Sequence, residues 1–294
     1  MKVAIIGTGN LGKSIAKGLI VKNAITTLYL SKRKLESIKD LEEYSGVKLT
    51  SDNREAVQNS DVIIFAVQPL QLEAILHEVK DSLTEKHILI STVTGFKIPR
   101  IEEIVGEDQF IIRAMPNTAI AVGKSMTCLC SNIKGEKRIA IAEAIFNRLG
   151  TSVIIPESKM QAATVICASG IAFWMRLIRA TTQGAVQLGF DAKEAQELSM
   201  QTCLGAASLL IESGNHPEEE INLVLISSTS PTNPKSISLL TRRLEIILFP
   251  SAPQSPTALL CMPCNFATIF LLISPAYTIV ITSIALASVI LLPS

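Results

Sequence analysis

A glycine-rich turn near the N-terminus carries the clearest chemical signal in this sequence. Residues 2–6 form an apolar run, and a helical pattern of apolar positions occupies residues 14–20. Between them, Gly7 allows a tight turn, Gly9 leaves room for backbone amides to approach a pyrophosphate, and Gly12 lets the helix pack closely on the strand. Because the amides at a helix N-terminus attract anions, the spacing predicts a dinucleotide-binding turn. Its residues are Gly7, Thr8, Gly9, Asn10, Leu11 and Gly12.

A hydroxyl and a run of cations follow the next predicted strand, residues 27–30. Enzymes that use NAD place an Asp or Glu about 20 residues after the glycine turn, where its carboxylate binds the ribose 2′-hydroxyl. This chain has Ser31, Lys32, Arg33 and Lys34 at that place. A carboxylate would repel a 2′-phosphate, whereas a hydroxyl and cations bind and neutralise it. The sequence therefore favours NADP(H), held by Ser31, Lys32 and Arg33, over the alternative of a solvated basic turn.

Alternating strands and helices must position these residues. Over residues 1–156, short β-branched runs alternate with helical patterns, which predicts an α/β fold with a Rossmann-type, doubly wound parallel sheet. In such sheets ligands bind beyond the carboxyl ends of the strands. Residues 67–69, 92–95 and 115–118 are therefore further candidates. The expected strands are residues 3–6, 27–30, 62–66, 88–91, 110–114 and 151–155.

Two helical patterns without strand signals follow the predicted sheet. The first is expected to begin at a capping box formed by Ser158 and Gln161 and to end at Gly189. The second is expected to begin at Asp191 and to end near Gly214. A helical domain attached to a dinucleotide domain usually closes a substrate cleft and forms a dimer. We therefore expect an all-helical second domain.

The composition changes abruptly at about residue 222. Ser, Thr, Pro, Leu and Ile dominate from there on, and residues 265–293 contain no charge and are long enough to span a bilayer. Three interpretations of this tail remain open: a membrane anchor, a hydrophobic core element, and a segment never selected to fold, such as an out-of-frame translation. Because helix, strand and charge patterns are lost at one point, we favour the last and do not expect a membrane partner. The expected domains are an NADP-binding Rossmann domain over residues 1–156 and an incomplete helical domain over residues 157–221. Residues 222–294 are expected to be an aberrant, apolar Ser/Thr/Pro-rich tail, for which an unfolded state is left open.

Composition and charge argue against several classes of protein. With 294 residues, 48% of them hydrophobic, the chain can bury a sizeable core, and its net charge of +1 gives no reason to expect a nucleic-acid partner. No secretory signal pattern opens the sequence, which makes a cytoplasmic location the expectation. The six cysteines and three histidines lack the spacing of a metal or disulfide site, and the C-x-x-C of Cys261 and Cys264 is interpreted as chance.

Several stretches of the sequence together form a recognisable set. They are residues 6–12, 51–57, 65–69, 113–118 with 122–123, and 201–217. The Arg-Ala-Met-Pro-Asn-Thr run at 113–118 is the most specific of them. With this set the chain, over residues 1 to about 221, resembles the pyrroline-5-carboxylate reductase family. The resemblance implies a homo-oligomeric, NADPH-dependent enzyme that reduces the C=N bond of 1-pyrroline-5-carboxylate to L-proline, the last step of proline biosynthesis.

The resemblance also implies roles that the patterns alone do not. It places Asn53 on the adenosine side of the cofactor, and it names no acid–base catalyst. Three of the implied roles have a purely structural alternative: Asn53 as a helix cap, Pro69 as the first residue of a helix, and Met115 as core packing. The residues expected at the nicotinamide half are Ala66, Val67, Gln68, Pro69, Thr92, Val93 and Thr94. Those expected between nicotinamide and substrate are Met115, Pro116 and Asn117.

The chain departs from the family pattern after His216 and Pro217. There the family continues through a Val-Thr-Ser/Thr-Pro-x-Gly-x-Thr segment that surrounds the substrate carboxylate, whereas residues 228–232 lack the glycine. The resemblance therefore implies a truncated dimerisation domain, weak substrate binding and a weakened dimer beside an intact cofactor site. Another Rossmann imine reductase, a hydroxyacid dehydrogenase, and a membrane-tethered or non-catalytic NADPH-binding protein are the alternative functions.

Overall fold

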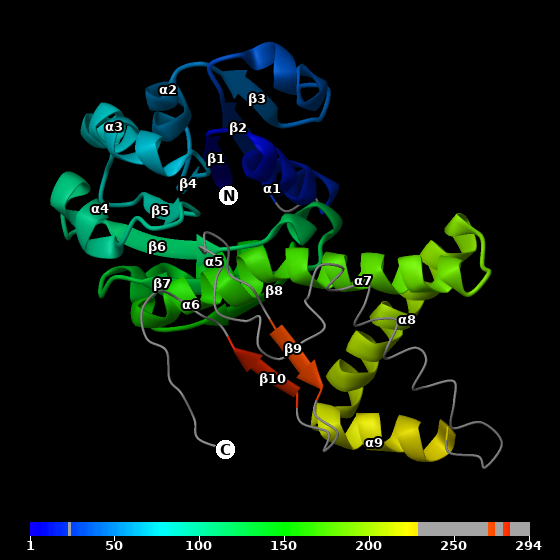
Figure 1. The fold of residues 1–294 in the computed structure, drawn as a ribbon. Coiled ribbons are helices and arrows are strands. Elements are labelled where there is room, and N and C mark those ends of the chain that lie inside the picture. Colours follow the sequence, from blue (N-terminus) through cyan, green and yellow to red (C-terminus); the bar gives the residue numbers. More distant parts are fainter. Residues whose placement is uncertain (23–24, 229–269, 274–278, 283–294) are drawn as a thin grey trace, which may run out of the picture. The chain divides into compact units, whose positions relative to one another are not determined.

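An eight-stranded sheet organises residues 1–154 of the computed structural model (Figure 1). Its strands lie in the order β3-β2-β1-β4-β5-β6-β7-β8, so the direction of strand order reverses between β1 and β4. This is the arrangement of a doubly wound, Rossmann-type sheet, and the predicted fold class is confirmed. The strands are β1 (Lys2–Ile6), β2 (Thr27–Ser31), β3 (Val47–Thr50), β4 (Val62–Phe65), β5 (Ile88–Ser91), β6 (Phe110–Met115), β7 (Ser125–Ser131) and β8 (Gly150–Ile154).

The sheet belongs to the first of two compact units. The units span residues 1–230 and 231–294. Both domains expected before residue 222 fall in the first unit, so their division at residue 156 stays a prediction. The structure describes residues 1–22, 25–228, 270–273 and 279–282.

Two of the eight strands, β3 and β7, are not predicted by the sequence patterns. β3 is a short edge strand whose apolar side chains are only partly buried. β7 consists largely of small and polar residues, and inside it the hydroxyls of Ser125 and Thr127 bond to each other at 3.2 Å. β7 also runs antiparallel to β6, because residues 116–124 are too few for a parallel crossover, which needs about a dozen residues or more. The sheet is therefore mostly rather than wholly parallel.

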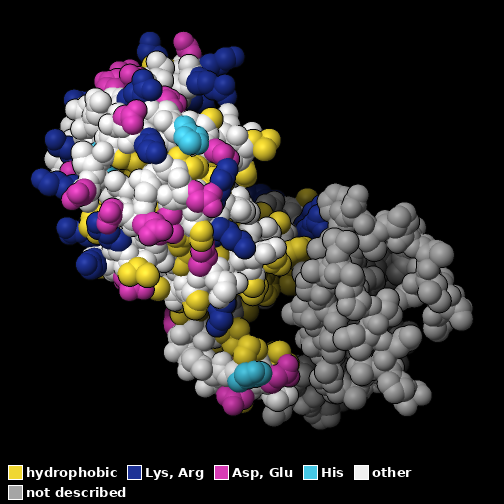
Figure 2. All heavy atoms as spheres, turned by 90° about the vertical axis from the view of Figure 1, so that its left-hand side faces the viewer, with side chains coloured by type: hydrophobic (Ala, Val, Ile, Leu, Met, Phe, Trp, Pro, Cys, Tyr) yellow, Lys and Arg dark blue, Asp and Glu magenta, His cyan; other side chains and the backbone are white. Residues whose placement is uncertain are grey.

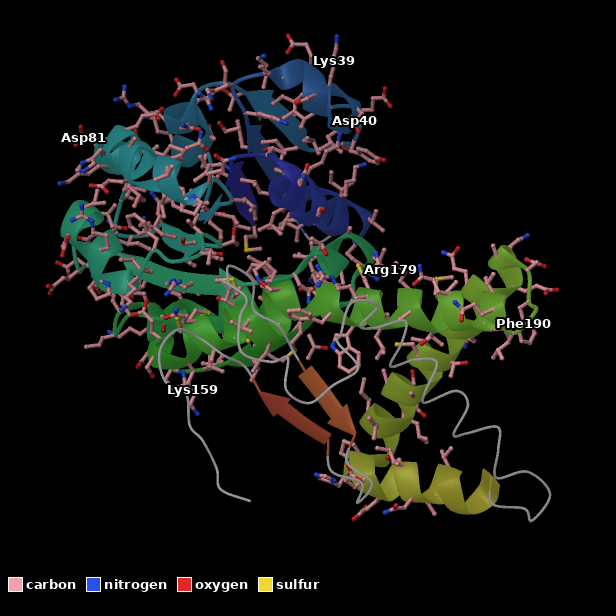
Figure 3. All side chains as sticks on the ribbon, viewed as in Figure 1. Lys39, Asp40, Asp81, Lys159, Arg179 and Phe190 are labelled. Atoms are coloured by element: carbon pink, nitrogen blue, oxygen red, sulfur yellow. The ribbon has the colours of Figure 1, made fainter. Side chains whose placement is uncertain are left out.

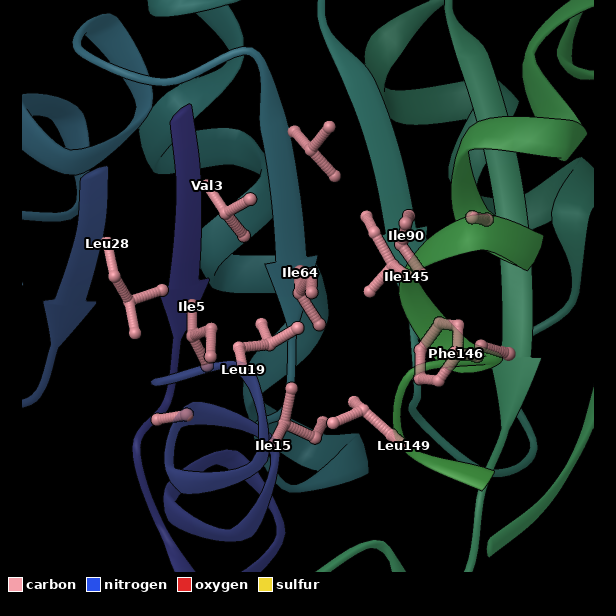
Figure 4. Packing of buried hydrophobic residues seen from close by; sticks show 14 of the residues in the cluster. Val3, Ile5, Ile15, Leu19, Leu28, Ile64, Ile90, Ile145, Phe146 and Leu149 are labelled. Carbon is pink, nitrogen blue, oxygen red and sulfur yellow. The ribbon is translucent and has the colours of Figure 1, made fainter. Parts of the chain in front are cut away.

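Helices cover both faces of the sheet. Successive residues of a strand point to opposite faces, so Ile5 lies in one core cluster with Ile15 and Phe146 (Figure 4), whereas Ile6 lies in a second cluster with Leu72. Each buried Ile or Leu side chain contributes about 1.5–3 kcal/mol, and together they hold the carboxyl end of β1 against the helices on both sides. These helices are α1 (Asn10–Val21), α2 (Asn53–Gln58), α3 (Pro69–Val79), α4 (Ile98–Val105) and α5 (Ile139–Phe146).

The helical region begins directly after β8. Asp191 caps its second long helix by accepting two backbone amides of the first turn, and Gly214 ends that helix with φ of +67°, as predicted. Gly189 follows the end of the first long helix, which is also as predicted. The capping box at Ser158 is wrong, because a 3-10 turn begins after Pro156 and no side chain caps it. The elements are the 3-10 turn (Glu157–Lys159), α6 (Met160–Ala163), a π-helical turn (Thr164–Ser169), α7 (Gly170–Gln187), α8 (Ala192–Ser213) and α9 (Pro217–Ser228).

Many apolar side chains of the helical region are exposed. Trp174 is 62% exposed and Ile211 is 81% exposed, and Phe190 lies at the outer end where α7 turns into α8 (Figure 3). Among the described residues, the stretch Glu157–Gln187 is long and apolar enough to cross a membrane, by length and composition only. Apolar patches of this kind on a protein surface mark places where another surface binds.

The chain is still helical where the sequence patterns change. α9 runs past residue 222 and ends at Ser228. In the second unit, β9 (Phe270–Ile273) and β10 (Ile279–Thr282) form an antiparallel pair. These two strands are the described part of the bilayer-length segment, and the rest of that segment lies outside the described residues.

Charges of both signs are intermingled on the face of the sheet that carries α2, α3 and α4 (Figure 2). Arg100 of α4 forms ion pairs with Glu73 of α3 at 2.6 Å and with Glu103 at 2.5 Å. Exposed pairs of this kind contribute about 0–1 kcal/mol. The apolar cluster beneath them, rather than the charges, therefore holds α3 beside α4.

Candidate functional site

The glycine turn joins the carboxyl end of β1 to α1, at the point where the strand order reverses. The fold itself requires glycine at two of its positions. Gly7 has φ of +91°, and a Cβ there would lie 2.3 Å from Cγ1 of Val67. A Cβ on Gly12 would lie 2.5 Å from the carbonyl oxygen of Gly7. These two glycines give the tight turn and the close packing of helix on strand that their spacing predicts.

Gly9 is not required by the fold. Its φ of −80° suits any residue, and a Cβ there would meet no atom within 4 Å. Gly9 is also the N-cap of α1, where no side chain caps the helix and no acidic residue lies in the first turn. The first-turn amides and the positive end of the helix dipole are therefore available to an anion. Both features fit the pyrophosphate of a dinucleotide.

Thr8 supports the turn from inside. It is fully buried, and its amide and its Oγ1 both donate to the carbonyl oxygen of Ser31 at 3.1 Å. The amide of Gly7 donates to the same oxygen, also at 3.1 Å. The end of β2, which carries the predicted 2′-phosphate residues, is thereby fixed against the glycine turn.

The hydroxyl of Ser31 begins a chain of hydrogen bonds. Its Oγ donates to Oδ1 of Asn53 at 2.5 Å, and Nδ2 of Asn53 donates to Oε2 of Glu78 on α3 at 3.0 Å. Asn53 is the first residue of α2, but Asp52 is the cap that accepts the amides of Arg54 and Glu55. The cap alternative for Asn53 is therefore wrong, and the structure brings it to Ser31. Glu78 is not predicted by the sequence, since only the fold brings it near residues 31 and 53.

The cations after Ser31 are accessible. Lys32 is half-buried, whereas Arg33 and Lys34 are exposed. Among the described residues, none of these three side chains forms an ion pair within 4.0 Å. Their positive charge is therefore available to a phosphate beside the end of β2.

A neighbouring lysine is already engaged. Lys13 of α1 donates to Oδ1 of Asp40 at 2.8 Å and to the carbonyl oxygen of Ser37 at 3.2 Å. The hydrogen bond from Lys13 lowers the pKa of the Asp40 carboxyl. Lys13 thus ties α1 to the 3-10 helix Leu35–Leu41, which also carries Lys39 (Figure 3).

The residues after β4 form the start of a helix. Ala66 continues the strand by donating its amide to Ile6 at 2.8 Å. Gln68 is the N-cap residue of α3, its amide donates to Oε1 of Gln71 at 3.4 Å, and Pro69 is the first residue of the helix. Pro69 therefore does start a helix, and its role at the nicotinamide half stays a prediction. Gln68 and Pro69 are both exposed, whereas Val67 is half-buried beside Gly7.

The residues after β5 divide between the core and the surface. The amide and hydroxyl of Thr92 donate to the carbonyl oxygen of Phe65 at 3.0 and 2.9 Å, and Val93 is 2% exposed. Thr94 is exposed, and its Oγ1 lies 3.9 Å from Sδ of Met115 at the end of β6. The structure thus brings Thr94 and Met115 together. Met115 itself is 3% exposed and packs in a core cluster, and its place between nicotinamide and substrate stays a prediction.

Asn117 joins the sheet to the helical region. Its Nδ2 donates to the carbonyl oxygen of Cys167 in the π-helical turn at 3.0 Å, and its Oδ1 accepts the amide of Ala119 at 3.0 Å. Pro116 beside it is buried. A π-helical turn leaves the helix ladder locally out of step, and Asn117 supplies a donor there.

A buried ion pair joins the same two regions and is missed by the sequence patterns. Arg113 of β6 is 5% exposed, and its Nη1 lies 2.9 Å from Oε1 of Glu157. The same oxygen accepts the amide of Ile98, the first residue of α4, at 2.7 Å. Arg113 stands in the most specific of the matching stretches, but the sequence gives no sign of its partner.

Two cysteines of β7, Cys128 and Cys130, are unsuited to thiolate chemistry. Sγ of Cys128 lies 3.7 Å from Sγ of Cys167. Burial raises the pKa of the Cys128 thiol to about 12 and that of the Cys130 thiol to about 11. The thiolate is the nucleophilic form, so neither of these two thiols is activated at neutral pH. Among the described residues no cluster of three or more His, Cys, Asp or Glu side chains is placed to hold a metal ion.

Comparison with known protein families matches both parts of the first unit. Residues 2–95 match the family described as NADP oxidoreductase, coenzyme F420-dependent. Residues 157–231 match the family described as pyrroline-5-carboxylate reductase dimerisation. The second match runs past residue 221, where the sequence resemblance ends.

Individual relatives agree with these matches. Pyrroline-5-carboxylate reductase 1 of Dictyostelium discoideum is 41% identical over 76% of this chain, which spans 43% of that relative's length. Pyrroline-5-carboxylate reductase 2 of the same organism is 35% identical over 77% of this chain and 81% of its own. A solved pyrroline-5-carboxylate reductase from Coxiella burnetii superposes with a TM-score of 0.72 at 29% identity, covering 83% of this chain and 95% of its own.

Proposed function

The chain belongs to the pyrroline-5-carboxylate reductase family, and we propose that it uses NADPH to reduce the C=N bond of 1-pyrroline-5-carboxylate to L-proline. The observation that carries the proposal is the open space over Gly9 at the uncapped N-terminus of α1. Neither the backbone conformation nor the packing of the fold requires a glycine at this position. Residues 2–95, which match the NADP oxidoreductase family, include this turn.

The chain's own groups divide the work of holding the cofactor. The amides of Asn10, Leu11 and Gly12 hold the pyrophosphate in the open space over Gly9, and the cations of Lys32 and Arg33 hold the 2′-phosphate. The nicotinamide supplies the hydride, which is the demanding part of the chemistry. Ala66, Gln68 and Thr94 border the nicotinamide half at the ends of β4 and β5, and Thr92 and Val93 support it from within. Thr8 supports the glycine turn.

The protein's part in the reduction is orientation and exclusion of water. Buried Met115 and Pro116 give the nicotinamide an apolar neighbour, and Asn117 holds the helical region beside them. A reacting carbon has to lie about 3–3.5 Å from its hydride donor. A protonated imine needs little more than this orientation, so we assign no acid–base catalyst.

The substrate carboxylate is the critical test of this site. A carboxylate removed from water needs several hydrogen-bond donors, and residues 229–232, where the family has its carboxylate-binding segment, lie outside the described residues. We propose that this chain binds the substrate weakly, because it lacks the glycine of that segment. Steady-state rates with 1-pyrroline-5-carboxylate, with 1-pyrroline, which lacks the carboxylate, and with a 3-hydroxy acid test this proposal. The first two are expected to be reduced with similar KM values. A preference for oxidising the hydroxy acid overturns the assignment.

We further propose that the protein is a cytoplasmic homo-oligomer whose exposed apolar helices are covered by a second copy. Trp174 and Ile211, both largely exposed, lie on helices of the region that matches the dimerisation family. The family match gives this apolar surface an occupant other than a bilayer. Because the expected domain is truncated, the dimer is expected to dissociate on dilution.

A further inference from the structure

The carboxylate of Glu78 fixes the direction of the hydrogen bonds that link Glu78, Asn53 and Ser31 beside the predicted 2′-phosphate position. A carboxylate offers only acceptors, so Glu78 can bond only to the NH₂ side of Asn53, as it does at 3.0 Å. Oδ1 of Asn53 then has to face Ser31, and an oxygen acceptor there requires a donor opposite. Ser31 supplies it through its hydroxyl proton at 2.5 Å.

This arrangement leaves the Ser31 hydroxyl without a proton to donate to a phosphate. A serine hydroxyl has one proton and two lone pairs, and the proton is committed to Asn53. Toward a third group the hydroxyl presents lone pairs, which a negatively charged phosphate oxygen avoids.

Glu78 also adds a negative charge that is not neutralised nearby. Among the described residues no cation lies within 4.0 Å of its carboxylate. The guanidinium of Arg54 is close, but its Nε donates to the main-chain oxygen of Glu78 at 2.9 Å. The half-buried carboxylate therefore opposes a phosphate dianion on the adenosine side of the site.

We propose that Glu78 determines the nucleotide preference of this site: through Asn53 it withholds the Ser31 hydroxyl from the 2′-phosphate and leaves that phosphate to the cations at 32–34. The inference rests on the proposed function. It makes Glu78 a positioning residue, which acts through Asn53, and it predicts that the chain accepts NADH as well as NADPH. In Glu78→Gln the three hydrogen-bonded side chains can reverse their donor and acceptor roles, because a Gln amide can face Asn53 with either its oxygen or its NH₂.

Direct binding tests the inference without turnover. Dissociation constants of NADPH and NADH are measured from nicotinamide fluorescence on the full chain without substrate. Glu78→Gln is expected to raise the preference for NADPH over NADH about tenfold, which corresponds to about 1.4 kcal/mol. Glu73→Gln removes the same charge from the same helix, where it pairs with Arg100, and is expected to leave the preference unchanged. An unchanged preference in Glu78→Gln overturns the inference.

A second substitution separates the hydrogen-bond chain from simple charge removal. Ser31→Ala in the native chain is expected to leave NADPH affinity within about twofold, whereas in Glu78→Gln it is expected to remove most of the gain and to leave only the part that comes from the lost charge. A gain that survives Ser31→Ala in full, or a large loss of NADPH affinity on Ser31→Ala in the native chain, overturns the inference. Ser31→Ala alone remains decisive if Glu78→Gln does not fold. Failure of both nucleotides to bind the native chain overturns the proposed function, and the inference with it.

Discussion

The reason for glycine at position 9 differs from the reasons for glycine at positions 7 and 12. Backbone strain and a clash with Val67 require glycine at position 7, and the packing of α1 requires it at position 12. Position 9 has an ordinary φ and empty surroundings, so only a ligand has a use for the missing side chain there. The three glycines of one motif thus serve two purposes.

Gly9→Val is expected to separate binding from folding. The new side chain meets no protein atom at its Cβ, but it occupies the space that a pyrophosphate needs, so NADPH affinity should fall by about 100-fold or more, which corresponds to about 2.7 kcal/mol. The thermal midpoint of unfolding should change little. Fluorescence titration and calorimetry measure the two effects.

Gly7→Ala is the matched contrast, because it forces a side chain onto a φ of +91° and against Val67. It is expected to lower both nucleotide affinity and thermal stability. If Gly9→Val destabilises the chain as much as Gly7→Ala does, the space over Gly9 is not a ligand site.

Sequence spacing is sufficient to predict the residues that lie in order along one segment. The glycine turn, the run from Ser31 to Lys34 and the cap at Asp191 depend on near neighbours, and the structure places the turn and the cap where the spacing predicts. Glu78 and Glu157 act on partners brought close only by the sheet. No local pattern marks such residues, and the sequence alone does not identify them.

At the scale of elements, one carboxylate connects three segments. Oε1 of Glu157 accepts from Arg113 of β6 and from the first amide of α4, and Glu157 itself begins the helical region. Strand β7 beside it escaped prediction because buried hydroxyls and thiols replace the apolar residues that mark a strand. The joint between sheet and helices is thus built from polar groups whose pairing only the fold defines.

Glu157→Gln is expected to destabilise this joint. The substitution leaves the guanidinium of Arg113 buried without a countercharge, and removing one partner of a buried pair costs about 3–5 kcal/mol. The free energy of unfolding in urea measures the loss. Glu103→Gln, which breaks an exposed pair with Arg100, is the control and should cost about 1 kcal/mol or less. Equal effects of the two substitutions contradict the role given to Glu157.

The turn before β5 makes stability depend on pH. His87 is 7% exposed, and its Nδ1 accepts the amide of Thr84 at 3.0 Å. Burial lowers the pKa of His87 from its ordinary value of 6.5, an effect only partly opposed by Asp61 and Ser60. The unfolded chain then binds the proton more readily, so His87 stabilises the fold above about pH 6.5 and this contribution is lost as the pH falls below that value.

His87→Asn keeps an acceptor for Thr84 but cannot titrate in this range. Between about pH 7 and 5, its stability is expected to fall less steeply than that of the native chain. Unfolding free energies measured across this range supply the comparison. His77→Asn is the control, because His77 is exposed. An identical slope in His87→Asn and the native chain contradicts the assignment.

For the whole molecule, the first unit carries the family features and the second does not. The match to the dimerisation family ends at residue 231, and the second unit begins at the same residue. Local patterns predicted the fold class because strand and helix periods are consistent over the first unit. They stopped predicting at about residue 222, where those periods disappear, although α9 continues to Ser228.

Association through the helical region should depend on its exposed apolar side chains. Trp174→Glu is expected to shift the sedimentation equilibrium of the full chain toward the monomer, because it places a charge in an apolar contact. Ile133→Glu is the control, since Ile133 is 88% exposed on the sheet side of the chain. A native chain that is monomeric at all concentrations, or a dimer that Trp174→Glu leaves intact, contradicts the proposed interface.

The central claim is tested most directly by NADPH oxidation on the full chain with 1-pyrroline-5-carboxylate, with L-proline measured in the same sample. The account predicts one L-proline for each NADPH oxidised, with a high KM for the imine because the carboxylate-binding segment is altered. Folded protein that binds NADPH but forms no L-proline at any substrate concentration contradicts it.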